Sequence, residues 1–114
     1  MPPRPWRERI EDIIAAIERV QTYTASMDFN EFLADHRTID AVIRNLEVIG
    51  EASGHVPEAV QERNPTIPWR EMRAMRNLLS HAYFVVDVEV VWKTICDNLP
   101  EVAPALRRLL DDTE

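Results

Sequence analysis

Apolar residues recur at three- and four-residue intervals along most of the chain, which is typical of amphipathic helices. No stretch shows a useful length of the apolar–polar alternation that predicts a strand. The pattern predicts one fold class, an all-α up-and-down bundle of four to five helices, built by residues 1–114 as a single domain. The helices are expected at about residues 5–23, 29–52, 58–63, 69–81 and 88–110.

Capping residues and prolines indicate where these helices begin and break. Ser26 or Asp28 is placed to cap the second helix, which we expect to bend or break at residues 35–38. The last helix is expected to begin after Asp87. Pro100 and Pro104 should kink it or split it, because proline removes a backbone donor and crowds the preceding turn.

The chain has only two glycines, Gly50 and Gly54. That number is too small for a P-loop or a dinucleotide-binding fingerprint. Gly54 suits the end of a helix. Gly50 lies inside a helical pattern, where glycine costs stability, and this indicates close approach of another backbone. The approaching backbone belongs either to the same domain or to a second copy of the chain.

Acidic residues outnumber Lys and Arg by 20 to 13, which gives a net charge of −7. Such a charge repels phosphates, so binding of RNA would require a local basic groove; the alternative partner is a protein. On the second helix, Arg44 is spaced to pair with Asp40 and Glu47.

The single cysteine, Cys96, is expected in the core and in a reducing compartment. No apolar run predicts a membrane span or a signal peptide, so the cytoplasm is the expected location.

Cationic, imidazole, amide and phenol groups gather between Met72 and Tyr83. On a helix of about 100° per residue, one arc of about 140° holds the polar members of this stretch. They are Arg70, Arg73, Arg76, Asn77, Ser80 and His81. Met72, Met75, Leu78 and Leu79 lie opposite. The polar arc carries no carboxylate, so it is either a solvated surface or a binding surface for an anionic ligand.

Metal-dependent sites fit the sequence poorly. A di-metal carboxylate bundle needs paired Glu-x-x-His units, but Glu51 and His55 are one residue too far apart and His36 has no acid three residues before it. The three histidines also lack a regular zinc-binding spacing. His36 and His55 are expected in turns with no chemical role. Ser80 and His81 are neighbours that point about 100° apart on a helix, so their adjacency does not make a catalytic pair.

The spacing Arg76-x-x-x-x-His81-x-Tyr83, with Asn77 beside the arginine, resembles the signature of HEPN ribonucleases and, more closely, of HepT-like toxins. Three further blocks fit that family in order, so the resemblance covers nearly the whole chain: residues 40–52, 67–69 and 91–92. Two positions depart from it. Ala74 stands where relatives are expected to have glycine, and Ala82 stands where an acidic residue is common; both bear on fine geometry and partner contacts.

The resemblance implies a metal-independent endoribonuclease, without a cofactor, that is the toxin of a toxin–antitoxin pair. RNA carries its own nucleophile, the 2′-OH. His81 would be the general base or acid, and Arg76 would hold the scissile phosphate. Asn77, Arg73 and Ser80 would support them. Tyr83 would receive AMP from a nucleotidyltransferase antitoxin; the alternative is a half-buried tyrosine with a structural role.

The expected partners are RNA, the antitoxin and a second copy of the chain, with no membrane and no DNA. Because one motif histidine cannot easily be base and acid at once, a homodimer would bring two Arg76–His81 segments to a shared groove. The alternative function is a non-catalytic module that docks a nucleotidyltransferase or a nucleotide on the same basic face.

Overall fold

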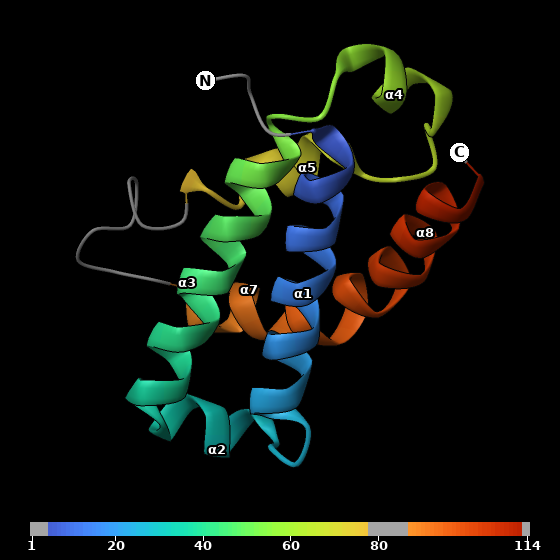
Figure 1. The fold of residues 1–114 in the computed structure, drawn as a ribbon. Coiled ribbons are helices and arrows are strands. Elements are labelled where there is room, and N and C mark those ends of the chain that lie inside the picture. The colour runs from blue at the N-terminus through green and yellow to red at the C-terminus, as the bar shows by residue number, and fades with distance from the viewer. Residues whose placement is uncertain (1–4, 78–86, 113–114) are drawn as a thin grey trace.

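The computed structural model describes residues 5–77 and 87–112. These residues form seven α-helices and one π-helical segment, with no β-strand among them, which confirms the predicted all-α fold. The elements are α1 (Trp6–Thr24), α2 (Phe29–Ala34), α3 (His36–Ser53), α4 (Glu58–Arg63), α5 (Trp69–Ala74), α7 (Val88–Lys93), η1 (Thr94–Asn98) and α8 (Leu99–Asp112) (Figure 1).

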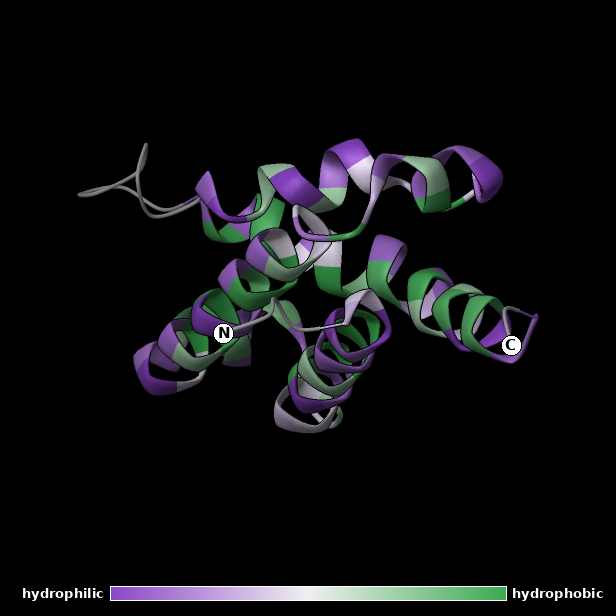
Figure 2. Cartoon of the chain, turned by 45° about the horizontal axis from the view of Figure 1, so that its top comes forward, coloured by the Kyte–Doolittle hydropathy of each residue, from purple (hydrophilic) through white to green (hydrophobic). Residues whose placement is uncertain are grey.

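The two long helices α1 and α3 run side by side in opposite directions and form the centre of the bundle (Figure 1). Each has an apolar stripe, and the hydrophobic and hydrophilic stripes of the helices are visible in Figure 2. α8 packs on α1, and α5 packs on α3 at the end where α1 begins. The buried core joins these stripes, as the helical periodicity predicts: Ile10, Ile13, Ile17, Val42, Leu46, Ile49, Met72, Leu99 and Leu106.

The second predicted helix breaks where the sequence indicates. Asp28 caps α2: its carboxylate accepts from the Glu31 amide at 2.8 Å, and the Glu31 side chain accepts from the Asp28 amide at 2.9 Å. Asp35 then separates α2 from α3. Its carboxylate accepts from the Thr38 amide at 3.0 Å and from the Thr38 hydroxyl at 2.8 Å. The Thr38 amide, followed by its hydroxyl, holds the pKa of Asp35 below its usual value, because both bonds favour the ionised carboxylate.

The last predicted helix is divided as the prolines indicate. Asp87 caps α7 through the Val90 amide at 3.3 Å. The π-helical segment η1 ends two residues before Pro100, and the chain changes direction between α7 and α8 (Figure 1). Proline has no backbone N–H, so one hydrogen bond of the helix is missing, and the wider π turn accommodates this loss. Pro104, by contrast, lies inside α8 without ending it.

Two expectations about single residues are wrong. Cys96 is exposed, because Ile95 and Leu99 take the inward positions of this segment and turn the thiol toward solvent. Partial desolvation, with a smaller contribution from Asp97, raises the pKa of the Cys96 thiol. His36 is the first residue of α3 rather than a turn residue. Within the described residues, no helix combines the length and the apolar character that crossing a lipid bilayer requires.

Asp35→Ala should lower the free energy of unfolding at pH 7, because it removes both bonds to Thr38. The pKa of Asp35 is depressed in the folded state, so its contribution is present above the unfolded pKa of about 3.9 and is lost as pH falls through the folded pKa. Urea unfolding of wild type and variant at pH 7 and near pH 2.5 measures this. Asp40→Ala, an exposed position on α3, is the control, and an Asp35 effect that persists undiminished in acid contradicts the account.

Candidate active site

Buried aromatic and sulfur-containing side chains fix α5 against α3. Trp69 and Met72 are 6% and 0% exposed, and the Trp69 indole Nε1–H donates to the Asn64 carbonyl at 3.0 Å. The Asn64 amide group in turn donates to the Val60 carbonyl at 2.8 Å, which ties the loop to α4. The short helix α5 is therefore held at both its buried face and its preceding loop, and it carries Arg76 just beyond its end.

A turn interrupts the predicted motif helix. The sequence predicts one helix over residues 69–81, but α5 ends at Ala74, Met75 and Arg76 form a turn, and Asn77 is helical again. Their amides bond three residues back, to the carbonyls of Met72 and Arg73, at 3.1 and 3.4 Å. Across this turn the regular 100° spacing no longer applies. Arg73, inside α5, faces α4, where its guanidinium donates to Gln61 Oε1 at 2.8 Å, whereas Arg76, in the turn, lies against α3.

Gly50 is the point at which α3 meets the backbone of Arg76. A Cβ added to Gly50 would run into the Arg76 amide nitrogen and lie 2.9 Å from Arg76 Cβ and 3.0 Å from its Cα. Such distances are too short for a real side chain, so the position needs glycine. The close approach predicted at Gly50 is confirmed, and it occurs within one chain. Gly50 therefore gives no support to a dimer contact.

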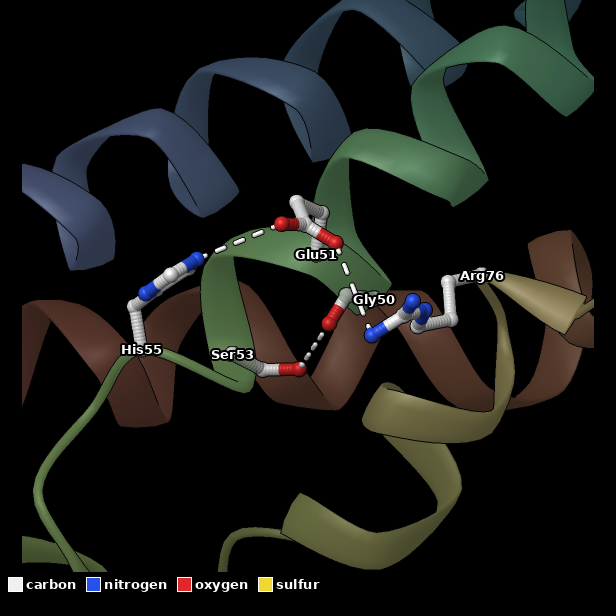
Figure 3. Close-up of polar contacts among 5 residues, drawn as sticks. All are labelled: Gly50, Glu51, Ser53, His55 and Arg76. Carbon is white, nitrogen blue, oxygen red and sulfur yellow. Dashed lines mark hydrogen bonds and ion pairs between the residues drawn. The ribbon is translucent and has the colours of Figure 1, made fainter.

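Glu51 links two side chains that the sequence treats separately (Figure 3). One carboxylate oxygen lies 3.2 Å from His55 Nε2 and accepts a hydrogen bond when that nitrogen carries the proton, and the other oxygen lies 3.7 Å from Arg76 Nη1. The three side chains are between 51% and 61% exposed. His55 does lie in a turn, as expected, but it is not isolated from the site. The tertiary fold also brings the Glu51 carboxylate to Arg76. The helix wheel shows no carboxylate on the face of Arg76, but in the folded chain α3 supplies one.

Arg76, in the turn after α5, opens onto a surface hollow between α1 and α3, which we call the Arg76 groove. Its volume is about 430 Å³. The lining holds both signs of charge: Arg9, Asp12, Arg44, Glu47, Val48, Glu51, Ala52 and Arg76. Sequence reasoning missed Arg9 and assigned Arg44 to surface pairs, because no short motif connects either residue to Arg76. Within residues 5–77 and 87–112, no group of three His, Cys, Asp or Glu residues is arranged to hold a metal ion.

The remaining predicted site residues fall into two groups. Asn77 is exposed and directly follows Arg76. Ser80, His81 and Tyr83 lie outside the described residues, so their roles stay predictions.

Comparison with known proteins gives a consistent result. A family model described as Ribonuclease HepT-like matches residues 13–109. The chain is 45% identical over 106 residues to "Probable ribonuclease HepT" from Thermococcus cleftensis, covering 93% of this chain and 96% of the relative. It is 35% identical over 114 residues to a "Putative RNase" of Methanocaldococcus jannaschii, covering 100% and 94%. Another protein so named, from Caldanaerobacter subterraneus, is 35% identical over 109 residues, covering 95% and 94%. No solved structure matches the chain.

Gly50→Ala should lower the free energy of unfolding by about 1–3 kcal/mol and displace Arg76, because the new methyl group pushes α3 and α5 apart. Urea unfolding measures the first effect, and the chemical shift of the Arg76 amide reports the second. Gly54→Ala is the matched control: its Cβ would lie 3.4 Å from the nearest atom, the Glu51 carbonyl oxygen, an ordinary contact. Equal stability of the two variants would contradict the assigned role of Gly50.

Proposed function

Since the chain belongs to the HepT-like ribonuclease family, we propose that it is a metal-independent endoribonuclease and the toxin of a toxin–antitoxin pair. The observation that carries the proposal is the placement of Arg76. Its side chain is 61% exposed, lines a groove between α1 and α3, and lies 3.7 Å from the Glu51 carboxylate. An arginine held in this way is available to an RNA phosphate.

Arg76 would bind the scissile phosphate through two of its N–H groups. Its ion pair with Glu51 is 3.7 Å long and lies between two exposed side chains, so it contributes about 0–1 kcal/mol. A phosphate accepts two charge-assisted hydrogen bonds from a guanidinium and therefore competes well with that pair. As the 2′-oxygen attacks, negative charge grows on the phosphate oxygens, and the same guanidinium stabilises it.

His81 would move the protons of the reaction. The 2′-OH gives its proton to a base as its oxygen bonds to phosphorus. The bond to the 5′-oxygen breaks, and that oxygen takes a proton from an acid. The products are a 2′,3′-cyclic phosphate and a 5′-hydroxyl, and no water or metal ion is consumed in this step. An imidazole titrates close to neutrality, which suits either role.

The proposal includes a homodimer in which two Arg76–His81 segments share one cleft. It rests on the single motif histidine per chain, since Gly50 packs inside one chain. One imidazole would then be the base and the other the acid. Light scattering that finds a fully active monomer would rule out this arrangement.

Tyr83 would be the point of control. It follows His81 by two residues and Arg76 by seven. AMP on its hydroxyl, added by a nucleotidyltransferase antitoxin, brings a permanent phosphodiester charge to the motif. That charge would pair with the guanidinium that RNA needs, and the adenosine would fill the space in front of it. The toxin would be silenced while remaining folded.

Arg76→Ala and His81→Ala should each reduce RNA cleavage at least about 100-fold, because they remove charge stabilisation and proton transfer respectively. Gel assays of a defined RNA measure the rate, and circular dichroism shows that the fold is retained. A chelator should leave the wild-type rate unchanged, and the products should carry cyclic phosphate ends.

Arg108→Ala, an exposed arginine on α8 outside the groove, is the control for loss of charge. A folded His81→Ala protein that cuts RNA at the wild-type rate would overturn the assignment. Chains that bind the antitoxin but cut no RNA would favour the non-catalytic binding module.

Tyr83→Phe should keep most of the ribonuclease activity and escape neutralisation, because the phenol oxygen that accepts AMP is missing. Mass spectrometry after incubation with the antitoxin, ATP and Mg²⁺ measures the adduct. Tyr23→Phe, an exposed tyrosine on α1, is the matched control and should be modified and silenced like wild type. The same adducts on Tyr83→Phe protein would place the modification elsewhere.

A further inference from the structure

We infer that the Arg76 groove is a phosphate-binding extension of the active site, in which Arg44 and Arg9 bind the RNA backbone next to the scissile phosphate. The inference rests on the proposed function, because Arg76 holds the scissile phosphate in that account. The groove lies between α1 and α3, and α1, α3 and the turn after α5 each contribute one arginine to its lining. Three guanidinium groups around one hollow suit successive phosphates of a single strand.

Arg44 forms no ion pair with the acidic residues near it in the sequence. Asp40 and Glu47 lie four and three residues away on α3, at spacings that favour ion pairs. Neither forms an ion pair with Arg44 within residues 5–77 and 87–112. The Arg44 side chain is exposed and lines the groove. Its donors therefore stay available to a phosphate that enters there.

Arg9 gives an independent observation. Its Nε atom is buried and has no hydrogen-bond acceptor among residues 5–77 and 87–112. A buried donor without an acceptor carries a free-energy cost, and a bound ion is one explanation for such a group. Arg9 lines the same groove as Arg44 from the opposite helix. A phosphate bound between α1 and α3 would accept hydrogen bonds from the Arg9 guanidinium.

The groove also explains how a chain of net charge −7 would hold RNA. Its three arginines are balanced by Asp12, Glu47 and Glu51, so the site is locally neutral within an acidic protein. Glu51 already contacts His55 and Arg76. Glu47 lies on α3 between Arg44 and Glu51, where its charge opposes a phosphate. Removing a groove arginine and removing the Glu47 charge should thus change RNA affinity in opposite directions.

The test measures binding apart from chemistry. A fluorescent single-stranded 2′-O-methyl oligoribonucleotide lacks the nucleophile, so it binds without being cut. Arg44→Gln and Arg9→Gln should each weaken its binding about tenfold. Each should also reduce the slope of log affinity against log salt by about 0.7, the value for one lost phosphate contact on a single strand. Glu47→Gln should tighten binding. With a cleavable RNA, KM should rise in the arginine variants while kcat stays near wild type.

Two exposed arginines provide matched controls. Arg19→Gln on α1 and Arg37→Gln on α3 remove the same charge from the same helices outside the groove, and both should bind RNA like wild type. Arg44 is exposed, so its variant should fold normally even if Arg9→Gln is unstable.

Three outcomes are decisive against the inference. Equal losses in the control and groove variants would show a general charge effect. Unchanged RNA affinity in Arg44→Gln, with Glu47→Gln also unchanged or weaker, would remove the groove from the RNA path. Both leave the proposed ribonuclease function intact if wild type still cuts RNA. A wild-type protein that neither binds nor cuts RNA would overturn the proposed function itself, and the inference with it.

Discussion

The contact between Gly50 and the backbone of Arg76 determines where the candidate active site lies. α3 can approach the end of α5 this closely only because Gly50 has no side chain. The buried Trp69 and Met72 pack α5 against α3. Because Gly50 has no Cβ, the backbones of Gly50 and Arg76 can come into contact. Glu51 is the next residue on α3, so the same contact brings its carboxylate to the Arg76 guanidinium. Packing of the core and geometry of the site are thus coupled through one residue.

The strength of the interactions differs between the core and the site. The core helices hold fully buried apolar side chains, whereas the Glu51, His55 and Arg76 side chains are each more than half exposed. Ion pairs at such exposure contribute little to stability. A ligand can therefore replace the partner of Arg76 without disturbing the bundle. This separation is compatible with the proposed modification of Tyr83, whose added charge would act on weak, exposed pairs and leave the fold in place.

Charge is distributed on a local scale that the net value of −7 conceals. Arginines on α1, α3 and at the end of α5 meet in one groove, together with three carboxylates. A phosphate that enters the groove interacts mainly with groups a few ångströms away, because charges beyond about 8–10 Å are screened at physiological salt. An acidic protein can thus bind RNA if it collects enough guanidinium groups at one place, and the fold rather than the composition does the collecting.

The sequence by itself determined the helices and most of their ends, because those depend on near neighbours. The break at Asp35 and the caps of Asp28 and Asp87 arise from side chains that bond residues three positions away. The division of the last helix near Pro100 follows from a donor that proline lacks. The position of Gly50 inside a helix likewise predicted close approach of another backbone, although the sequence left open whether that backbone belonged to the same chain or to a second copy.

Only the tertiary structure decided what stands around Arg76. A helix wheel assumes one unbroken helix, yet a turn at Met75 and Arg76 interrupts it, and Arg73 and Arg76 have different neighbours. It also describes one helix alone, so it does not show that Glu51 faces Arg76 or that Arg9 and Arg44 share its groove. Periodicity records which side of a helix is buried, but the partners of an exposed side chain are set by the packing of helices distant in sequence.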